Sequence, residues 1–209
     1  IEFEKKPIVR KYILRVPRST LEDITADFER IKREIKKRYG IDLKSIDIIT
    51  LQKLPKILRE CNYDREFWDV TVYIWNDEEI LDVKSGKNGK MYGLAIDIGT
   101  TTLVGYLMNM ETGESEVIST ALNPQVKYGE DLISRISYII ESDAEKERRR
   151  RELQNCILMG INHIISEIVS KAGIKEEDIY GIVMVGNTAM HHIFFGIDPE
   201  YLAISPFTP

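Results

Sequence analysis

AIDIGTTT, residues 95–102, is the stretch that decides how the second half of this 209-residue chain folds. An acidic residue ends an apolar segment, Gly99 follows, and threonines lead into a second apolar segment. This pattern predicts a strand over 92–98, a tight turn, and a strand over 101–110. The glycine lets the turn approach a ligand closely. Phosphate oxygens can be bound by converging backbone N–H groups, which here would belong to Gly99, Thr100, Thr101 and Thr102.

Asp97 lies just before this turn, at the end of the first strand. A carboxylate there can hold Mg²⁺ directly or through water and so offset the charge of a phosphate. The alternative is a hairpin with a polar turn and no ligand, because such turns are common. The surrounding pattern favours a phosphate loop, since the turn joins two apolar strands and a further strand and helix follow.

The residues after this motif predict an α/β fold. A turn at 111–113 leads into a third strand over 114–121. Helical periodicity follows over 129–141 and 145–172, and Gly173 ends the second helix. Residues 179–185 (IYGIVMV) are apolar enough for a central strand. The predicted order is therefore β-β-β-α-β-α, with a last helix that ends near Gly196.

Gly186, Asn187 and Thr188 connect this last strand to the last helix. A strand that feeds a helix N-terminus is a natural anion site. We expect these residues to face the γ-phosphate or the attacking water. The alternative is a helix cap without a ligand, since asparagine and threonine are common caps.

Residues 1–86 predict a small α+β domain, and 87–209 form the second domain. The boundary lies in KSGKNGK, 84–90, which has two glycines, three lysines and no apolar residue. Strands are expected over 8–16, 46–49, 68–75 and 79–83. A helix is expected from Ser19 or Thr20 to Gly40, and another over 51–59, in which Pro55 is tolerable only near the start.

Composition excludes several classes of protein. The net charge of -5 argues against a nucleic-acid binder, and no uncharged apolar run is long enough to span a membrane. Residues 1–90 carry 20 Lys and Arg against 17 Asp and Glu, whereas 91–209 carry 9 against 17. Cys61 and Cys156 are too few for a disulfide framework or an iron–sulfur site. We expect reduced thiols and a cytoplasmic protein.

Three separated motifs resemble the reductive activators of corrinoid proteins. They are YGLAIDIGTTTLVGYL at 92–107, NPQVKYGEDLISRI at 123–136 and VGNTAMHHIFFGIDPEYLAISPFTP at 185–209. PIVRKYILRVPRSTLEDITADFERI at 7–31 resembles the middle domain of that family. The family is part of the acetate and sugar kinase, heat-shock chaperone and actin superfamily. The resemblance implies a ribonuclease-H-like first lobe, incomplete here, preceded by the small α+β domain.

The resemblance also implies a function for the full-length protein. Such activators bind ATP with Mg²⁺ and dock on a corrinoid protein or corrinoid methyltransferase. They promote reduction of its cobalt from Co(II) to Co(I) for methyl transfer. The electron comes from an iron–sulfur domain that lies outside this chain. The sequence starts at Ile1 and matches only part of the family, so we expect a fragment that is inactive alone and binds nucleotide weakly or not at all.

Other hypotheses stay open at this point. A small-molecule kinase or phosphohydrolase of the same superfamily shares the phosphate loop, although no catalytic base is evident. An actin-like scaffold would use nucleotide as a conformational switch. A homodimer is also compatible with the sequence. One polar stretch is either an ordinary loop and helix start or a region for partner docking and coupling; its residues are Asn123, Gln125, Tyr128, Gly129, Asp131 and Arg135.

Overall fold

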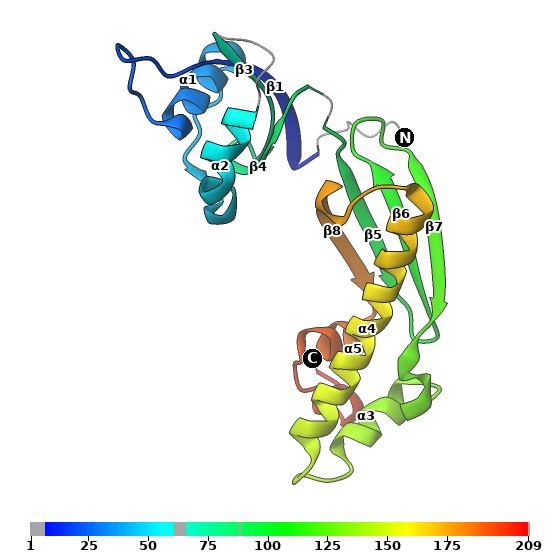
Figure 1. Cartoon of the computed structure of the whole chain (residues 1–209). Coiled ribbons are helices and arrows are strands. Elements are labelled where there is room, and N and C mark those ends of the chain that lie inside the picture. Colours follow the sequence, from blue (N-terminus) through cyan, green and yellow to red (C-terminus); the bar gives the residue numbers. More distant parts are fainter. Residues whose placement is uncertain (1–6, 61–65, 88, 209) are drawn as a thin grey trace. The chain divides into compact units, whose positions relative to one another are not determined.

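The computed structural model describes residues 7–60, 66–87 and 89–208, and the chain forms two compact units. Unit 1 comprises Ile1–Met91, and unit 2 comprises Tyr92–Pro209. The sequence analysis placed the domain boundary at Gly86. Each unit is built around its own mixed four-stranded sheet with its own apolar core (Figure 1).

Unit 1 is an α+β unit. Its elements are β1 (Val9–Pro17), α1 (Asp27–Tyr39), β2 (Ser45–Ile46), α2 (Ile48–Glu60), β3 (Phe67–Trp75) and β4 (Glu79–Ser85). The sheet order is β1-β3-β4-β2, with a parallel pairing only between β2 and β4. The two helices cover one face of this sheet and share its core (Figure 1). Asn76 and Asp77 lie in the turn between β3 and β4, and both residues adopt positive φ angles.

The predicted start of the first helix is wrong. Helix α1 begins at Asp27, and Ser19 and Thr20 lie in the preceding loop. Asp23 explains the difference, because its carboxylate accepts hydrogen bonds from the N–H and the hydroxyl of Thr25. A short polar side chain that bonds nearby backbone competes with the helical conformation. The loop therefore continues for about two helical turns beyond the predicted start, and the helix begins at Asp27.

Pro55 also lies elsewhere than expected. It is in the middle of α2 rather than near its start. A proline at this position removes one helical hydrogen bond. Leu54 and Leu58 on the same helix are nevertheless almost completely buried against the sheet, so tertiary packing supports the helix through this defect.

Unit 2 follows the predicted order of strands and helices. Its elements are β5 (Tyr92–Ile98), β6 (Thr102–Asn109), β7 (Ser115–Leu122), η1 (Pro124–Tyr128), α3 (Leu132–Ile140), α4 (Lys146–Ala172), η2 (Glu176–Asp178), β8 (Ile179–Gly186), α5 (Thr188–Phe195) and α6 (Glu200–Ala203). The sheet order is β7-β6-β5-β8, and only β5 and β8 are parallel. Helix α4 lies along one face of the sheet (Figure 1). Its buried isoleucines pack against the strands.

Two expectations about unit 2 are corrected. Gly129 does not belong to a helix that starts there; it follows η1, and Asp131 caps the shorter helix α3. The apolar strand β8 was expected to be central, yet it lies at the edge of the sheet. Val183 and Val185 on this strand are 67% and 54% exposed. Its apolar character is therefore not matched by burial within the part of the chain that the structure describes.

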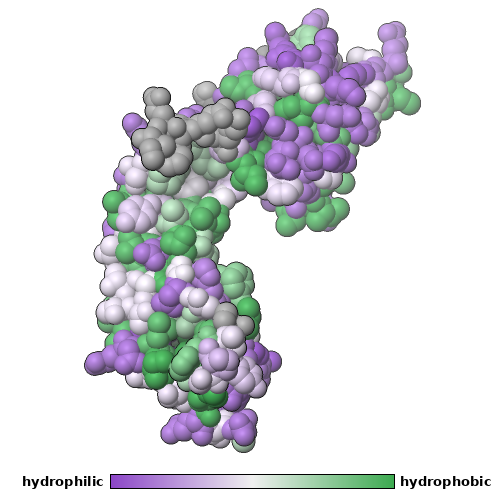
Figure 2. All heavy atoms as spheres, turned by 180° about the vertical axis from the view of Figure 1, so that it is seen from behind, coloured by the Kyte–Doolittle hydropathy of each residue, from purple (hydrophilic) through white to green (hydrophobic). Residues whose placement is uncertain are grey.

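The surfaces of the two units differ in the view from behind. Purple hydrophilic residues dominate unit 1, whereas white and green residues are mixed over unit 2 (Figure 2). This difference follows the sequence, in which charged residues are concentrated in the first 90 positions. None of the described helices has the length and apolar character needed to cross a membrane.

Candidate functional site

The loop between β5 and β6 is held in one conformation by close packing. A Cβ atom at Gly99 would lie 2.4 Å from the carbonyl oxygen of Thr102. No side chain fits at that distance, so the turn requires glycine here. The sequence prediction of a tight turn with a close backbone approach is confirmed at this residue.

Three successive carbonyl groups of this loop accept hydrogen bonds from inside the unit. Asn123 Nδ2 donates to the Gly99 carbonyl oxygen over 2.9 Å, and Asn123 N–H donates to that of Thr101 over 2.7 Å. Arg135 Nη2 donates to the Thr100 carbonyl oxygen over 2.5 Å. Asn123 and Arg135 are fully buried. On the inner side of the loop, the carbonyl groups of residues 99–101 are therefore all hydrogen-bonded.

The outer side of the loop consequently carries the N–H groups. In a planar trans peptide the carbonyl and the following N–H point in opposite directions. With the carbonyls of residues 99–101 directed inward, the N–H groups of Thr100, Thr101 and Thr102 are directed outward. Successive N–H groups of this kind form an anion-binding nest. This geometry suits the phosphate oxygens that the sequence analysis assigned to the loop.

The end of β8 lies beside this loop. Gly186 pairs with Ile98 in the parallel ladder between β8 and β5. A Cβ atom at Gly186 would lie 3.1 Å from the Ile98 carbonyl oxygen, so the two strand ends approach closely. Parallel strands end at the same edge of a sheet. The structure thus brings together the two segments that the sequence analysis singled out separately.

Asn187 joins these two segments directly. Its Oδ1 accepts a 2.9 Å hydrogen bond from the N–H of Met190 and so caps helix α5. Its Nδ2 donates to the hydroxyl oxygen of Thr100 over 3.2 Å. The cap that the sequence left as an alternative is therefore present, and the same side chain also fixes the loop. Thr188 is exposed in the first turn of the helix.

Asp97 lies on the sheet face opposite α4. It alternates along β5 with the buried residues Ile96 and Ile98, and its side chain is exposed. Its neighbours across the sheet are Val104 and Val185. Magnesium is commonly held by one or two carboxylates together with water and phosphate oxygens. A single exposed carboxylate near the phosphate loop fits this requirement, and the described residues contain no cluster of three potential metal ligands.

The polar stretch over 123–135 has a role that the sequence analysis did not foresee. Asn123, Gln125 and Arg135 are fully buried, so these three side chains do not suit the partner-docking alternative that the sequence left open. Gln125 receives a hydrogen bond from Arg135 Nη1 over 3.2 Å and donates to the Leu153 carbonyl oxygen over 2.9 Å. These side chains support the loop from beneath. Contacts over so long a sequence distance leave no local signal.

Histidine and cysteine do not build a second site in the described residues. His192 Nδ1 lies 2.8 Å from the Thr188 carbonyl oxygen, and His163 Nε2 lies 3.8 Å from Glu167. Cys156 is buried and contacts the Pro124 carbonyl oxygen, whereas Cys61 lies outside the described residues. Two cysteines cannot supply the four thiolates of a typical iron–sulfur cluster. The chain therefore does not fit such a cluster by itself.

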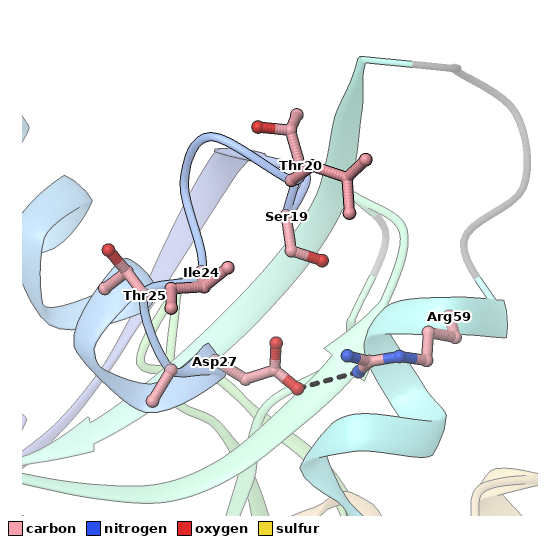
Figure 3. Close-up of a pocket in the computed structure, with 8 residues that line it drawn as sticks. Ser19, Thr20, Ile24, Thr25, Asp27 and Arg59 are labelled. Carbon is pink, nitrogen blue, oxygen red and sulfur yellow. Dashed lines mark hydrogen bonds and ion pairs between the residues drawn. The ribbon is translucent and has the colours of Figure 1, made fainter.

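Unit 1 has an open hollow of about 760 Å³ between residues 19–27 and α2. Asp27 and Arg59 face each other across it in an ion pair of 2.7 Å (Figure 3). The sequence analysis missed this hollow. Its one carboxylate is already paired with Arg59, so we assign the hollow no chemistry.

Two known proteins resemble this chain, one over its whole length and one over part of it. A solved structure described as a reductive activator for corrinoid, iron–sulfur protein has a TM-score of 0.79 and 32% sequence identity; the match covers 100% of this chain and 32% of that one. The corrinoid activation enzyme RamQ of Eubacterium limosum is 36% identical over 121 residues, which are 58% of this chain and 20% of that enzyme. The matched parts therefore span a fifth to a third of the length of these relatives.

Family models identify the two units. The model of the RACo linker region matches residues 1–90, the part that the sequence analysis called a middle domain. The model of the RACo middle region matches residues 92–209. Together with the structural match, these results show that the chain belongs to the RACo family, of which it contains the linker and middle regions.

Proposed function

We propose that unit 2 contributes one half of an ATP site in a reductive activator of a corrinoid protein. The observation that carries this proposal is the loop at 99–102, in which the carbonyls of residues 99–101 are bonded inward, so that the N–H groups of residues 100–102 face outward. Membership of the RACo family and the similarity to RamQ support the corrinoid role. The activity belongs to the full-length protein, of which this chain is one part.

In this proposal each part of the site has a distinct task. The N–H groups of Thr100, Thr101 and Thr102 bind phosphate oxygens of ATP. The N-terminus of α5, which begins at Thr188 beside Gly186 and Asn187, adds a favourable partial positive charge. Asp97 holds Mg²⁺, which offsets the phosphate charge. Asn187 keeps the loop and the helix N-terminus in register through its bond to Thr100.

The proposed reaction is a one-electron reduction. One electron passes from a reduced iron–sulfur centre, which is thereby oxidised, to Co(II) of the partner corrinoid protein, which becomes Co(I). The iron–sulfur centre belongs to a domain outside this chain. Binding and hydrolysis of ATP drive the step or reset the complex between the two proteins.

The topology of unit 2 supports a ribonuclease-H-like lobe of the actin and sugar-kinase type. Three antiparallel strands are followed by helices and then by β8, which pairs in parallel with β5. The phosphate loop joins the first two of these strands. This is the arrangement that the proposed ATP site requires.

The proposal is tested by replacing Asp97 with alanine in the full-length protein. Reduction of a Co(II) corrinoid protein is followed by visible absorption with and without Mg-ATP, under exclusion of oxygen. We expect the variant to lose the ATP-dependent part of the reduction. Asp143→Ala, a change at another exposed aspartate of unit 2, serves as control. ATP-dependent reduction at the native rate in Asp97→Ala would remove the magnesium assignment.

A further inference from the structure

Two arginine side chains are fully buried in the described residues, and they differ in one respect. Arg30 in unit 1 donates to the backbone of residues 18–25 and forms an ion pair of 2.7 Å with Asp23. Arg135 in unit 2 also donates to backbone carbonyls, but no described carboxylate lies within ion-pair distance of it. A buried charge without a counter-charge is unfavourable.

The partners of Arg135 are all neutral. Its Nε donates to the Gly129 carbonyl oxygen over 2.9 Å, its Nη1 to Gln125 Oε1 over 3.2 Å, and its Nη2 to the Thr100 carbonyl oxygen over 2.5 Å. The planar guanidinium thus supplies donors in three directions at once, which a lysine ammonium on a flexible stem does not reproduce. Burial lowers the pKa of Arg135, and the charge of Asp131 opposes this effect.

The position of this charge points to its counter-ion. Arg135 contacts the inner side of the loop at Thr100, and the outer side carries the outward N–H groups. An anion on the outer side would bind the N–H groups of the loop. Only one layer of backbone would then separate it from the positively charged guanidinium of Arg135. Because the guanidinium is buried, its interaction with such an anion is screened less than that of an exposed charge.

We infer that Arg135 is the positioning residue of the phosphate loop. Its guanidinium holds the Thr100 carbonyl inward, so the loop N–H groups stay directed at the phosphate, and the phosphate balances the buried charge. Because Arg135 belongs to α3, this helix is connected to the nucleotide through the hydrogen bond between Arg135 and the Thr100 carbonyl. The inference deepens the proposed function and rests on it.

The test compares Arg135→Met, Arg135→Lys and Arg30→Met in the full-length protein. Arg30→Met is the matched control, because it removes an equally buried guanidinium that holds a different loop. The dissociation constant of Mg-ATP is measured by calorimetry, and thermal unfolding reports on folding. We expect Arg135→Met to weaken Mg-ATP binding about 10- to 100-fold, the range found for groups that orient metal ligands. Arg30→Met is expected to leave this constant unchanged.

Two readouts separate positioning from a general structural effect. Adenosine has no phosphate, so its affinity, measured by competition, should be equal in Arg135→Met and the native protein. Arg135→Lys keeps the positive charge but loses the planar set of guanidinium donors. Its affinity for Mg-ATP should lie between those of the native protein and Arg135→Met. If Arg135→Met does not fold, Arg135→Lys carries the test, with an expected weakening of about tenfold.

The possible failures are distinguishable. If the native protein binds Mg-ATP and the folded Arg135 variants bind it equally well, the role of Arg135 is overturned. The proposed function is then unaffected. Equal weakening of ATP and adenosine binding also overturns it, since the effect would then be general. A native full-length protein that binds no Mg-ATP overturns the proposed function and, with it, this inference.

Discussion

Asn187 Nδ2 donates a hydrogen bond of 3.2 Å to the Thr100 hydroxyl oxygen, although the two residues are 87 positions apart in the chain. Asn187 caps helix α5, and Thr100 lies in the loop after β5. Through this bond, a helix N-terminus and a loop with outward N–H groups are held at the same edge of the sheet. The candidate site depends on this juxtaposition.

Replacing Asn187 with alanine should therefore have two effects. Loss of the cap is expected to lower the free energy of unfolding by about 1 kcal/mol. Loss of the bond to Thr100 should also weaken Mg-ATP binding by the full-length protein. Chemical denaturation and calorimetry measure the two quantities.

Asp47→Ala provides the control for a cap alone. Asp47 Oδ1 accepts hydrogen bonds from the N–H groups of Ile49 and Thr50 at the start of α2, in unit 1. This variant should lose similar stability and keep the native affinity for Mg-ATP. If both variants bind Mg-ATP like the native protein, Asn187 is only a helix cap.

Gly99→Ala tests the close approach within the loop. The new Cβ would lie 2.4 Å from the Thr102 carbonyl oxygen, so the backbone must shift. We expect a loss of about 1–3 kcal/mol in the free energy of unfolding, as for other overpacked positions. Circular dichroism during urea denaturation measures this loss.

Gly181→Ala is the matched glycine control in the same unit. No heavy atom lies within 4 Å of a Cβ at Gly181. Its free energy of unfolding should stay within about 0.5 kcal/mol of the native value. Equal stability of the two alanine variants would show that the loop adapts to a side chain at Gly99.

The pH dependence of unit 1 should reflect Asp23. Hydrogen bonds from Thr25, and then from Arg30, hold the pKa of this carboxyl well below its ordinary value. The folded state thus favours the ionised form. Its stabilising effect is present above the unfolded pKa of about 3.9 and is lost as the pH falls toward the folded pKa.

The variant Asp23→Asn measures this effect. The native protein should exceed it in stability at neutral pH, and the difference should shrink below about pH 4. Both tryptophans, Trp68 and Trp75, belong to unit 1, so their fluorescence during urea denaturation reports on this unit. A difference that stays constant between about pH 7 and pH 3 would contradict the assigned cause.

Much of the fold could be predicted because its signals are local. The strand predicted over 92–98 is observed with the same bounds, since its alternation and its flanking residues are unambiguous. Gly40 and Gly173 end helices as expected. The prediction of a helix start near Thr20 was wrong. Capping propensity does not reveal that the Asp23 carboxylate accepts a hydrogen bond from Thr25 within a loop.

The candidate site could be predicted only in part. The glycine of the loop and the polar residues after β8 stand out in the sequence, and parallel pairing brings them together. The support beneath the loop depends on Arg135, which is 35 residues from its partner Thr100. Such a contact is created by tertiary packing. A sequence pattern that shows a polar residue at a helix start cannot reveal whether it points to solvent or into the core.

Hydrogen exchange of the full-length protein, with and without Mg-ATP, shows whether the loop at 99–102 and the start of α5 bind the nucleotide. We expect Mg-ATP to slow exchange in the peptides covering 95–102 and 186–190, because their N–H groups bind phosphate or lie beside it. Exchange over 18–25 in unit 1 should not change. If calorimetry shows bound Mg-ATP while both segments of unit 2 exchange at the unliganded rate, the nucleotide binds elsewhere and the account is contradicted.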